Sequence, residues 1–166
     1  SKQQEDDRRV LEAINQAVPD YLVVHGRTYQ DDYTEPCDHQ AIAWFCQQTN
    51  IPVIGNGDVK DAKSARALLD VGCAGVMVSR ASVGAPWCIA QIQHGLKIGN
   101  TQAKVPSKEQ SRERYLSHLH DLLKLYSGND KPVQGQAQGL VKYYAKRNNW
   151  PDSWLADVAR WQNIIS

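Results

Sequence analysis

Three short apolar runs, each stopping abruptly at small, polar or charged residues, constrain the fold of this chain most. They are Val23-Val24 before His25-Gly26-Arg27-Thr28, Ile51-Pro52-Val53-Ile54 before Gly55-Asn56-Gly57-Asp58, and Gly75-Val76-Met77-Val78 before Ser79-Arg80. Buried parallel strands have this appearance, and functional side chains gather at their carboxyl ends. Helical patterns separate the runs, so the sequence predicts a repeat of strand, loop and helix.

The expected elements follow the chain in a simple order. The pattern predicts helices over 5–18, after Asp38, after Asp61 and over 87–96, with strands over 21–24, 51–54 and 75–78; Asp38 and Asp61 are placed as N-caps. A polar linker near 99–106 follows. Beyond it we expect a long helix around 115–126, a Gly- and Gln-rich loop over 127–138, and two further helices, with no strand signal.

This order predicts an α/β fold, a partial TIM (β/α)8 barrel over residues 1–103, followed by an all-α helical domain over residues 104–166. A complete barrel needs about 250 residues. Three strand–helix units cannot close one, and alone they would expose a sheet edge and one wall of the core. The chain is therefore expected to be a fragment of a larger protein or to pair with another chain.

Charge is distributed unevenly along the chain. Residues 1–100 carry 9 Lys+Arg against 12 Asp+Glu, whereas residues 101–166 carry 10 against 6. A basic tail behind an acidic front suggests a polyanionic partner, and the alternative is a solvated helical surface. No apolar run approaches the roughly 20 residues of a membrane span. The four cysteines, Cys37, Cys46, Cys73 and Cys88, have no Cys-x-x-Cys spacing, which favours neither metal nor disulfides and fits a cytoplasmic protein.

Two adjacent loops have the chemistry of an anion site. In Asn56-Gly57-Asp58, Gly57 allows close approach of the backbone to a phosphate, although Asn-Gly is also a common turn. Ser79-Arg80 precedes a short helix, and Arg80 offers a forked donor to phosphate; a salt bridge at the rim is the alternative. His25 could donate to the same phosphate, and Arg27 could reach a substrate.

A second candidate surface lies on the helix expected near residue 140. Lys142, Tyr143, Lys146 and Arg147 are spaced so that they form a basic and aromatic stripe away from the apolar face. Such a stripe suits RNA phosphates and base stacking, and the alternative is again a solvated face. His118 and His120 point to different faces of one helix and cannot bind a metal together.

On these motifs, from about Leu11 to Ile92 and including Pro86-Trp87, the chain resembles the tRNA-dihydrouridine synthases. The resemblance implies that the three strands are the last three of an FMN-binding TIM barrel, and that a helical tRNA-binding domain follows. NADPH would reduce FMN, which passes hydride to C6 of uracil in tRNA. His25, Asn56, Gly57, Asp58, Ser79 and Arg80 would contact FMN, and Arg27, Lys142, Tyr143, Lys146 and Arg147 would contact tRNA.

The chain also departs from the family pattern. Ser79-Arg80 stands where the family usually has Gly-Arg, and no cysteine here lies in the family's Gly-Cys-Pro loop, which supplies the general acid. The catalytic cysteine is therefore expected upstream, in a missing N-terminal half of the barrel, and this chain alone is expected to be inactive. The alternatives are another FMN-barrel oxidoreductase and a non-catalytic RNA-binding fragment.

Overall fold

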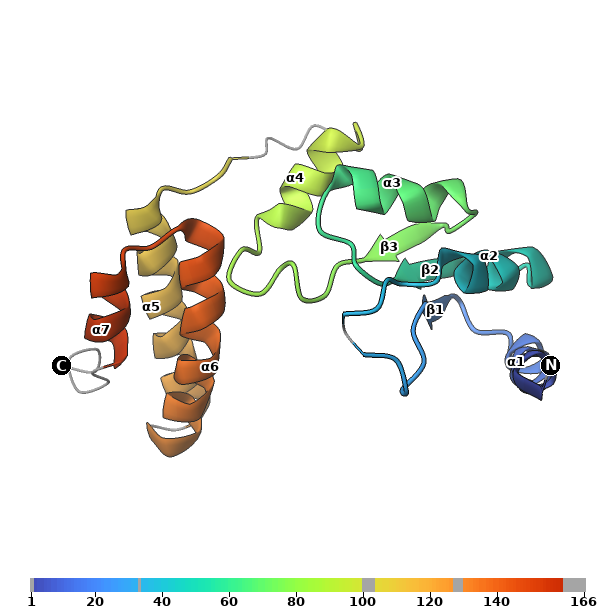
Figure 1. The fold of residues 1–166 in the computed structure, drawn as a ribbon, viewed down its shortest axis with the longest axis horizontal. Coiled ribbons are helices and arrows are strands. Elements are labelled where there is room, and N and C mark those ends of the chain that lie inside the picture. The colour runs from blue at the N-terminus through green and yellow to red at the C-terminus, as the bar shows by residue number, and fades with distance from the viewer. Residues whose placement is uncertain (1, 33, 100–103, 127–129, 160–166) are drawn as a thin grey trace. The chain divides into compact units, whose positions relative to one another are not determined.

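The computed structural model describes residues 2–32, 34–99, 104–126 and 130–159. These residues divide into two compact units. We call residues 1–80 with 91–101 the sheet unit, and residues 81–90 with 102–166 the helical unit. The elements, in chain order, are α1 (Lys2–Ala17), β1 (Leu22–His25), α2 (His39–Gln48), β2 (Val53–Asn56), α3 (Ala62–Asp70), β3 (Gly75–Met77), α4 (Cys88–Gly95), α5 (Lys108–Leu125), α6 (Asp130–Asn148) and α7 (Asp152–Ala159) (Figure 1).

The sheet unit is built on a three-stranded parallel sheet in the order β1-β2-β3, which confirms the expected mixed α/β architecture. Val24 lies opposite Gly55, and His25 lies opposite Asn56. The first two strands begin one and two residues later than the apolar runs suggested. They also end later than expected, so His25 and Asn56 are the final residues of their strands rather than members of the following loops.

Helices cover one face of this sheet. Leu22 and Val24 of β1 and Val53 of β2 point to the same face of the sheet. They pack in one core with Ile42 of α2 and Leu68 of α3. The expected caps are present: the Asp38 carboxylate accepts from the backbone N–H groups of residues 40 and 41, and Asp61 forms a capping box with Ser64. Ser64 and Asp61 thus satisfy backbone donors that a helix start leaves open.

The opposite face of the sheet is largely uncovered among the described residues. Strand alternation assigns Val23, His25, Asn56 and Met77 to it. Val23 and Met77 are each 44% exposed although both are large and apolar. The residues that end the strands therefore lie on the face that helices α2 and α3 do not cover.

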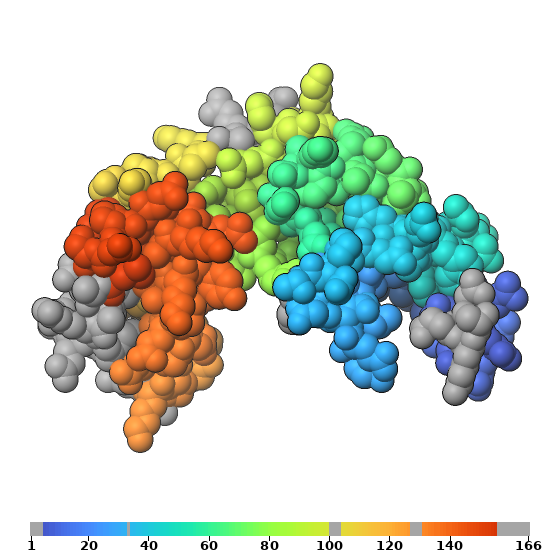
Figure 2. Space-filling model, viewed as in Figure 1, coloured from blue at the N-terminus to red at the C-terminus, as the bar shows by residue number. Residues whose placement is uncertain are grey.

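The helical unit has its own core, made mainly of aromatic rings. Tyr115 of α5 is fully buried and packs on Tyr144 of α6 and on Trp150 at ring-centroid distances of 5.1 and 5.7 Å. Its polar groups are satisfied: the Tyr115 hydroxyl donates to the carbonyl of Ala137 at 3.1 Å, and Trp150 Nε1 donates to Ser111 Oγ at 2.6 Å. In the space-filling view, α6 forms an orange to red surface (Figure 2).

One expectation about this unit is wrong. A loop was expected over 127–138, but residues 130–138 belong to α6; residues 127–129 lie outside the described residues. Val133 and Ala137 are buried one turn apart in line with Tyr144, so tertiary packing supports the helix. Gly135 and Gly139 face open space, and the roughly 1 kcal/mol that each costs in a helix is offset by this burial.

Candidate functional site

The carboxyl ends of the three strands meet at one edge of the sheet. Register pairs His25 with Asn56, and Asn56 with Met77. Side chains follow this register, because Asn56 Nδ2 lies 3.4 Å from Met77 Sδ and Ser79 Oγ donates to Asn56 Oδ1 at 3.1 Å. In open parallel sheets, ligands bind outside this edge. Sequence reasoning missed Met77, which reads simply as part of an apolar strand.

The backbone turns sharply after β2 to place the next carboxylate. Gly57 has φ +145° and Asp58 has φ +52°, a left-handed conformation that is uncommon for a residue with a side chain. A Cβ on Gly57 would overlap the sulfur of Cys37, and a Cβ on Gly26 would overlap the same sulfur. Both glycines are therefore required by close packing against one thiol, as well as by the backbone at Gly57.

Cys37 joins the loop after β1 to the loop after β2. Its backbone N–H donates to Asp58 Oδ2 at 3.2 Å, and its Sγ lies 3.8 Å from the carbonyl oxygen of Asn56. Burial, and secondarily the charge of Asp58, raises the pKa of the Cys37 thiol, so the group stays neutral and packs. No sequence motif marks this role, since it depends on contacts with Gly26 and Gly57.

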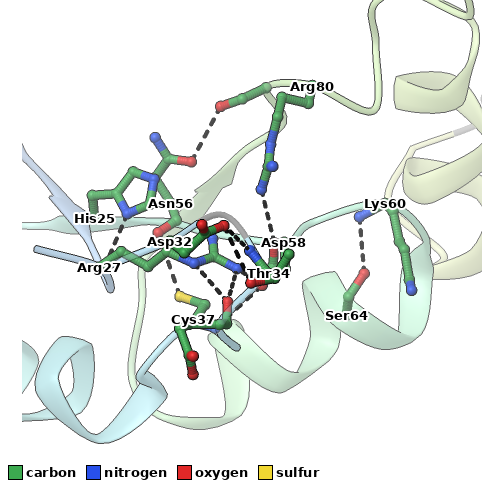
Figure 3. Close-up of polar contacts among 12 residues, drawn as sticks. His25, Arg27, Asp32, Thr34, Cys37, Asn56, Asp58, Lys60, Ser64 and Arg80 are labelled. Atoms are coloured by element: carbon green, nitrogen blue, oxygen red, sulfur yellow. Dashed lines mark hydrogen bonds and ion pairs between the residues drawn. The ribbon is translucent and has the colours of Figure 1, made fainter. Parts of the chain in front are cut away.

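Asp58 links two arginines across the edge. Its Oδ2 pairs with Arg27 at 2.5 Å and its Oδ1 pairs with Arg80 at 3.1 Å (Figure 3). Burial by itself would raise the pKa of Asp58, but the hydrogen bonds from Arg27 and Cys37 and the charge of Arg80 outweigh it. They hold the pKa below its ordinary value. Asp58 is therefore a carboxylate under ordinary conditions.

The two arginines differ in what they can still contact. The Arg27 side chain is only 5% exposed; its Nε donates to the Glu35 carbonyl oxygen at 2.8 Å, and its Nη2 bonds that oxygen and Asp58. The Arg80 side chain is 50% exposed. Arg27 is thus buried at this edge of the sheet, where it stabilises the loop that follows β1. Arg80 instead exposes its guanidinium at the surface.

His25 is exposed at the end of β1 and has a defined hydrogen-bonding role. Its Nδ1 accepts from the backbone N–H of Arg27 at 3.1 Å, which assigns the proton of the neutral ring to Nε2. A hollow of about 260 Å³ beside it is lined by His25, Arg27, Thr28, Tyr29 and Asp31. The ring can therefore donate a hydrogen bond outward from this edge.

The sequence-predicted residues His25, Asn56, Gly57, Asp58, Ser79 and Arg80 are thus brought together at one edge of the sheet unit. Amide, hydroxyl, imidazole and guanidinium groups gather there with the Asp58 carboxylate, which is engaged by two arginines. Such a donor set can bind an anion together with a polyhydroxyl chain. The edge therefore has the groups that a phosphate-bearing ligand requires.

The stripe residues belong to the helical unit. Lys142, Tyr143, Lys146 and Arg147 are exposed on α6, and Tyr143 is 47% exposed, while Tyr144 and Ala145 face the core. His120 is exposed, and His118 packs near Tyr144 at 6.5 Å between ring centroids. Within the described ranges, no three His, Cys, Asp or Glu side chains are placed to hold a metal ion, and no helix has the length and apolarity to cross a bilayer.

Comparison with known proteins identifies the family of this chain. A family model described as dihydrouridine synthase matches residues 2–160. A probable tRNA-dihydrouridine synthase of Rhodobacter capsulatus is 42% identical over 106 residues, covering 63% of this chain and 32% of that protein. A tRNA-dihydrouridine synthase B of Shewanella oneidensis is 40% identical over 130 residues, covering 78% and 37%.

A further relative matches a larger share of the chain. A probable tRNA-dihydrouridine synthase of Rickettsia bellii is 33% identical over 146 residues, covering 87% of this chain and 42% of that protein. The chain thus spans between about a third and two fifths of the length of these relatives. Because the family model matches residues 2–160, which is nearly all of this chain, the chain belongs to the dihydrouridine synthase family.

Proposed function

We propose that the protein containing this chain reduces uridine to dihydrouridine in tRNA, with FMN as cofactor and NADPH as reductant. The observation that carries this proposal is the convergence of His25, Asn56, Ser79 and Arg80 at one sheet edge in a member of this family. In the overall reaction one uridine, one NADPH and one proton give one dihydrouridine and NADP⁺. The C5=C6 double bond is reduced and the nicotinamide is oxidised.

The donor set fits FMN. We assign Arg80 and the backbone N–H groups at Ser79 and around Gly57 to the phosphate, and His25 and Asn56 to the ribityl chain and ring. When bound, FMN supplies a hydride carrier between NADPH and the uracil. We do not assign Asp58 to direct contact with FMN, because its carboxylate accepts hydrogen bonds from Arg27 and Arg80 and would repel a phosphate. It orients Arg80 instead.

Arg27 also takes a supporting role in this proposal. Its guanidinium is committed to Asp58 and to the Glu35 carbonyl oxygen inside the edge, so it fastens the loop after β1 rather than reaching tRNA. Contact with tRNA is assigned to the exposed stripe on α6, where three cations can meet phosphates and Tyr143 can stack on a base.

No general acid is assigned within this chain. None of its four cysteines stands in a Gly-Cys-Pro sequence, and burial raises the pKa of Cys37 and Cys88 and raises that of Cys73 to about 12. Thiols of that kind hold their protons in the core. The proton delivered to uracil C5 is therefore proposed to come from a cysteine in the other half of the barrel.

The uncovered face of the sheet supports a barrel completed by further strands. Val23 and Met77 are each 44% exposed on that face, and burying them would remove apolar surface from water. We assign residues 1–103 to the carboxyl-terminal part of a (β/α)8 barrel and residues 104–166 to a helical tRNA-binding domain. The remaining strands come from the same gene product or from a second chain.

The proposal is tested by incubating the complete protein with FMN, NADPH and unmodified tRNA, then measuring dihydrouridine in nuclease digests by mass spectrometry. A gain of two hydrogens on a uridine, dependent on NADPH, is the expected result. Flavin binding and NADPH oxidation without tRNA affinity would favour another FMN-barrel oxidoreductase. tRNA binding without any flavin would favour a non-catalytic RNA-binding protein.

A further inference from the structure

The segment that leaves the proposed phosphate site folds with the helical unit. Residues 81–90 follow Ser79 and Arg80 directly in the chain, yet they belong to the helical unit with α5 and α6 rather than to the unit that contains the strands. Ala81, Ala85 and Cys88 are buried there. The chain continues directly from Arg80 into a segment that a different unit holds in place.

Gly84 is the point of closest contact between this segment and α6. It has φ +76°, and a Cβ built there would lie 2.6 Å from the backbone nitrogen of Tyr144 and 2.7 Å from the carbonyl carbon of Tyr143. Distances below 3.0 Å do not occur for real Cβ atoms, so a side chain at this position would displace the helix backbone. Tyr143, whose backbone Gly84 contacts, is also a member of the basic and aromatic stripe.

The Asn148 side chain stabilises this contact between residues 81–90 and α6 by hydrogen bonds. Its Nδ2 donates to the Gly84 carbonyl oxygen at 3.0 Å and to the Tyr144 carbonyl oxygen at 2.7 Å. One amide group therefore uses its two hydrogens on different partners, one on its own helix and one on the segment. A second contact lies nearby, where the Arg114 guanidinium is 5.8 Å from the centroid of the Trp87 ring.

We infer that Asn148 is a positioning residue that couples tRNA binding on α6 to flavin binding beside Arg80. The inference rests on the proposed function. The contact of Gly84 with the backbone of Tyr143 means that an α6 held in place by RNA also holds the segment joined to Arg80. By linkage, two ligands that favour the same arrangement each tighten the binding of the other by the same factor. Asn148 is the side chain that transmits this preference.

The test measures the dissociation constant of FMN by flavin fluorescence in the complete protein, with and without saturating tRNA. In the parent, tRNA should lower this constant about fivefold or more. In Asn148→Ala the factor should fall to about one, while FMN alone binds more weakly. Gly84→Ala, which breaks the same contact from the other side, should give the same loss of coupling.

Asn149→Ala is the matched control. Asn149 has φ +51°, so alanine destabilises the same helix end without touching Gly84. This variant should keep the parental coupling factor. The inference is overturned if Asn148→Ala retains that factor, if Asn149→Ala loses it equally, or if the parent binds both ligands without coupling. A parent that binds neither FMN nor tRNA would instead refute the proposed function.

Discussion

At the residue scale, Asp58 determines what the edge of the sheet presents to a ligand. It occupies two arginines, one nearly buried and one half-exposed, and it also accepts the backbone N–H of Cys37. Without this carboxylate the Arg27 guanidinium would lie in the interior with its charge uncompensated, which is costly. The same carboxylate pairs with Arg80, so a negative residue beside the proposed anion site has a consistent physical role.

Replacing Asp58 with Asn should destabilise the protein by about 1–3 kcal/mol at pH 7, less than for a fully buried pair because Asp58 is partly exposed. The lowered pKa of Asp58 means that its contribution is present above the unfolded pKa of about 3.9 and is lost as the pH falls through the folded value. The difference in urea-unfolding free energy should therefore shrink toward acid pH. A difference independent of pH would contradict the ion-pair role, and Asp70→Asn serves as an exposed control.

Gly57→Ala should cost about 2–5 kcal/mol, because it adds a clash with the Cys37 sulfur to an unfavourable backbone conformation. Combining it with Cys37→Ala should recover the part of the stability loss that is due to the overlap with the Cys37 sulfur. The expected coupling energy in a double-mutant cycle is about 1–2 kcal/mol. Thermal or urea unfolding of the four proteins measures this energy. Strictly additive losses would show that Cys37 does not pack against Gly57.

The location of these residues at one edge of the sheet was predictable from sequence, but their pairing was not. The endings of the apolar runs placed His25, Asn56, Ser79 and Arg80 at one edge correctly, since parallel strands end together. The pairing of Asp58 with Arg27 joins residues 31 positions apart and depends on a left-handed backbone at Asp58. No local pattern encodes a contact of that kind.

At the element scale, α6 is where sequence and structure differ most. The Gly and Gln content of residues 127–138 suggested a loop, yet α6 runs from Asp130 to Asn148. Pro132 lies in the first turn of this helix, where proline is tolerated, and Gly135 faces open space. Burial of Val133 and Ala137 against α5 decides the outcome, and that burial could not be foreseen without the partner helix.

Gly135→Ala should stabilise the protein by about 0.5–1 kcal/mol, because a helical glycine is replaced where nothing lies within 4 Å of the added methyl group. Gly84→Ala is the contrasting variant and should destabilise. Differential scanning calorimetry or urea unfolding would detect both changes. No gain from Gly135→Ala would argue that this part of α6 is not helical in solution.

The stripe on α6 gives a second prediction at this scale. Lys146→Ala with Arg147→Ala should weaken tRNA binding and reduce the salt slope by about two units or less, because phosphate contacts release counterions. FMN occupancy of the complete protein, measured without tRNA, should not change. Lys104→Ala with Lys108→Ala removes the same charge from exposed positions of the helical unit and should have a smaller effect. If the stripe variant binds tRNA with the parental affinity and the parental salt slope, the stripe is only a solvated helix face.

At the scale of the whole molecule, the fold class followed from repetition of strand, loop and helix, whereas the division into units followed from packing. Sequence suggested one boundary near residue 103, but residues 81–90 cluster with the helices that come later in the chain. Gly84 and Asn148 lie 64 positions apart, so their contact has no local signature.

The central claim is that the carboxyl edge of the sheet binds the flavin phosphate through Arg80. The most direct measurement compares FMN with riboflavin, which lacks the phosphate, in fluorescence titrations of the complete protein and its Arg80→Ala variant. A lost charge-assisted contact should weaken FMN binding about 10- to 100-fold while leaving riboflavin within about twofold. Lys63→Ala, which removes an exposed charge from α3, should change neither. Equal weakening of both ligands by Arg80→Ala, or no weakening of FMN, would contradict the claim.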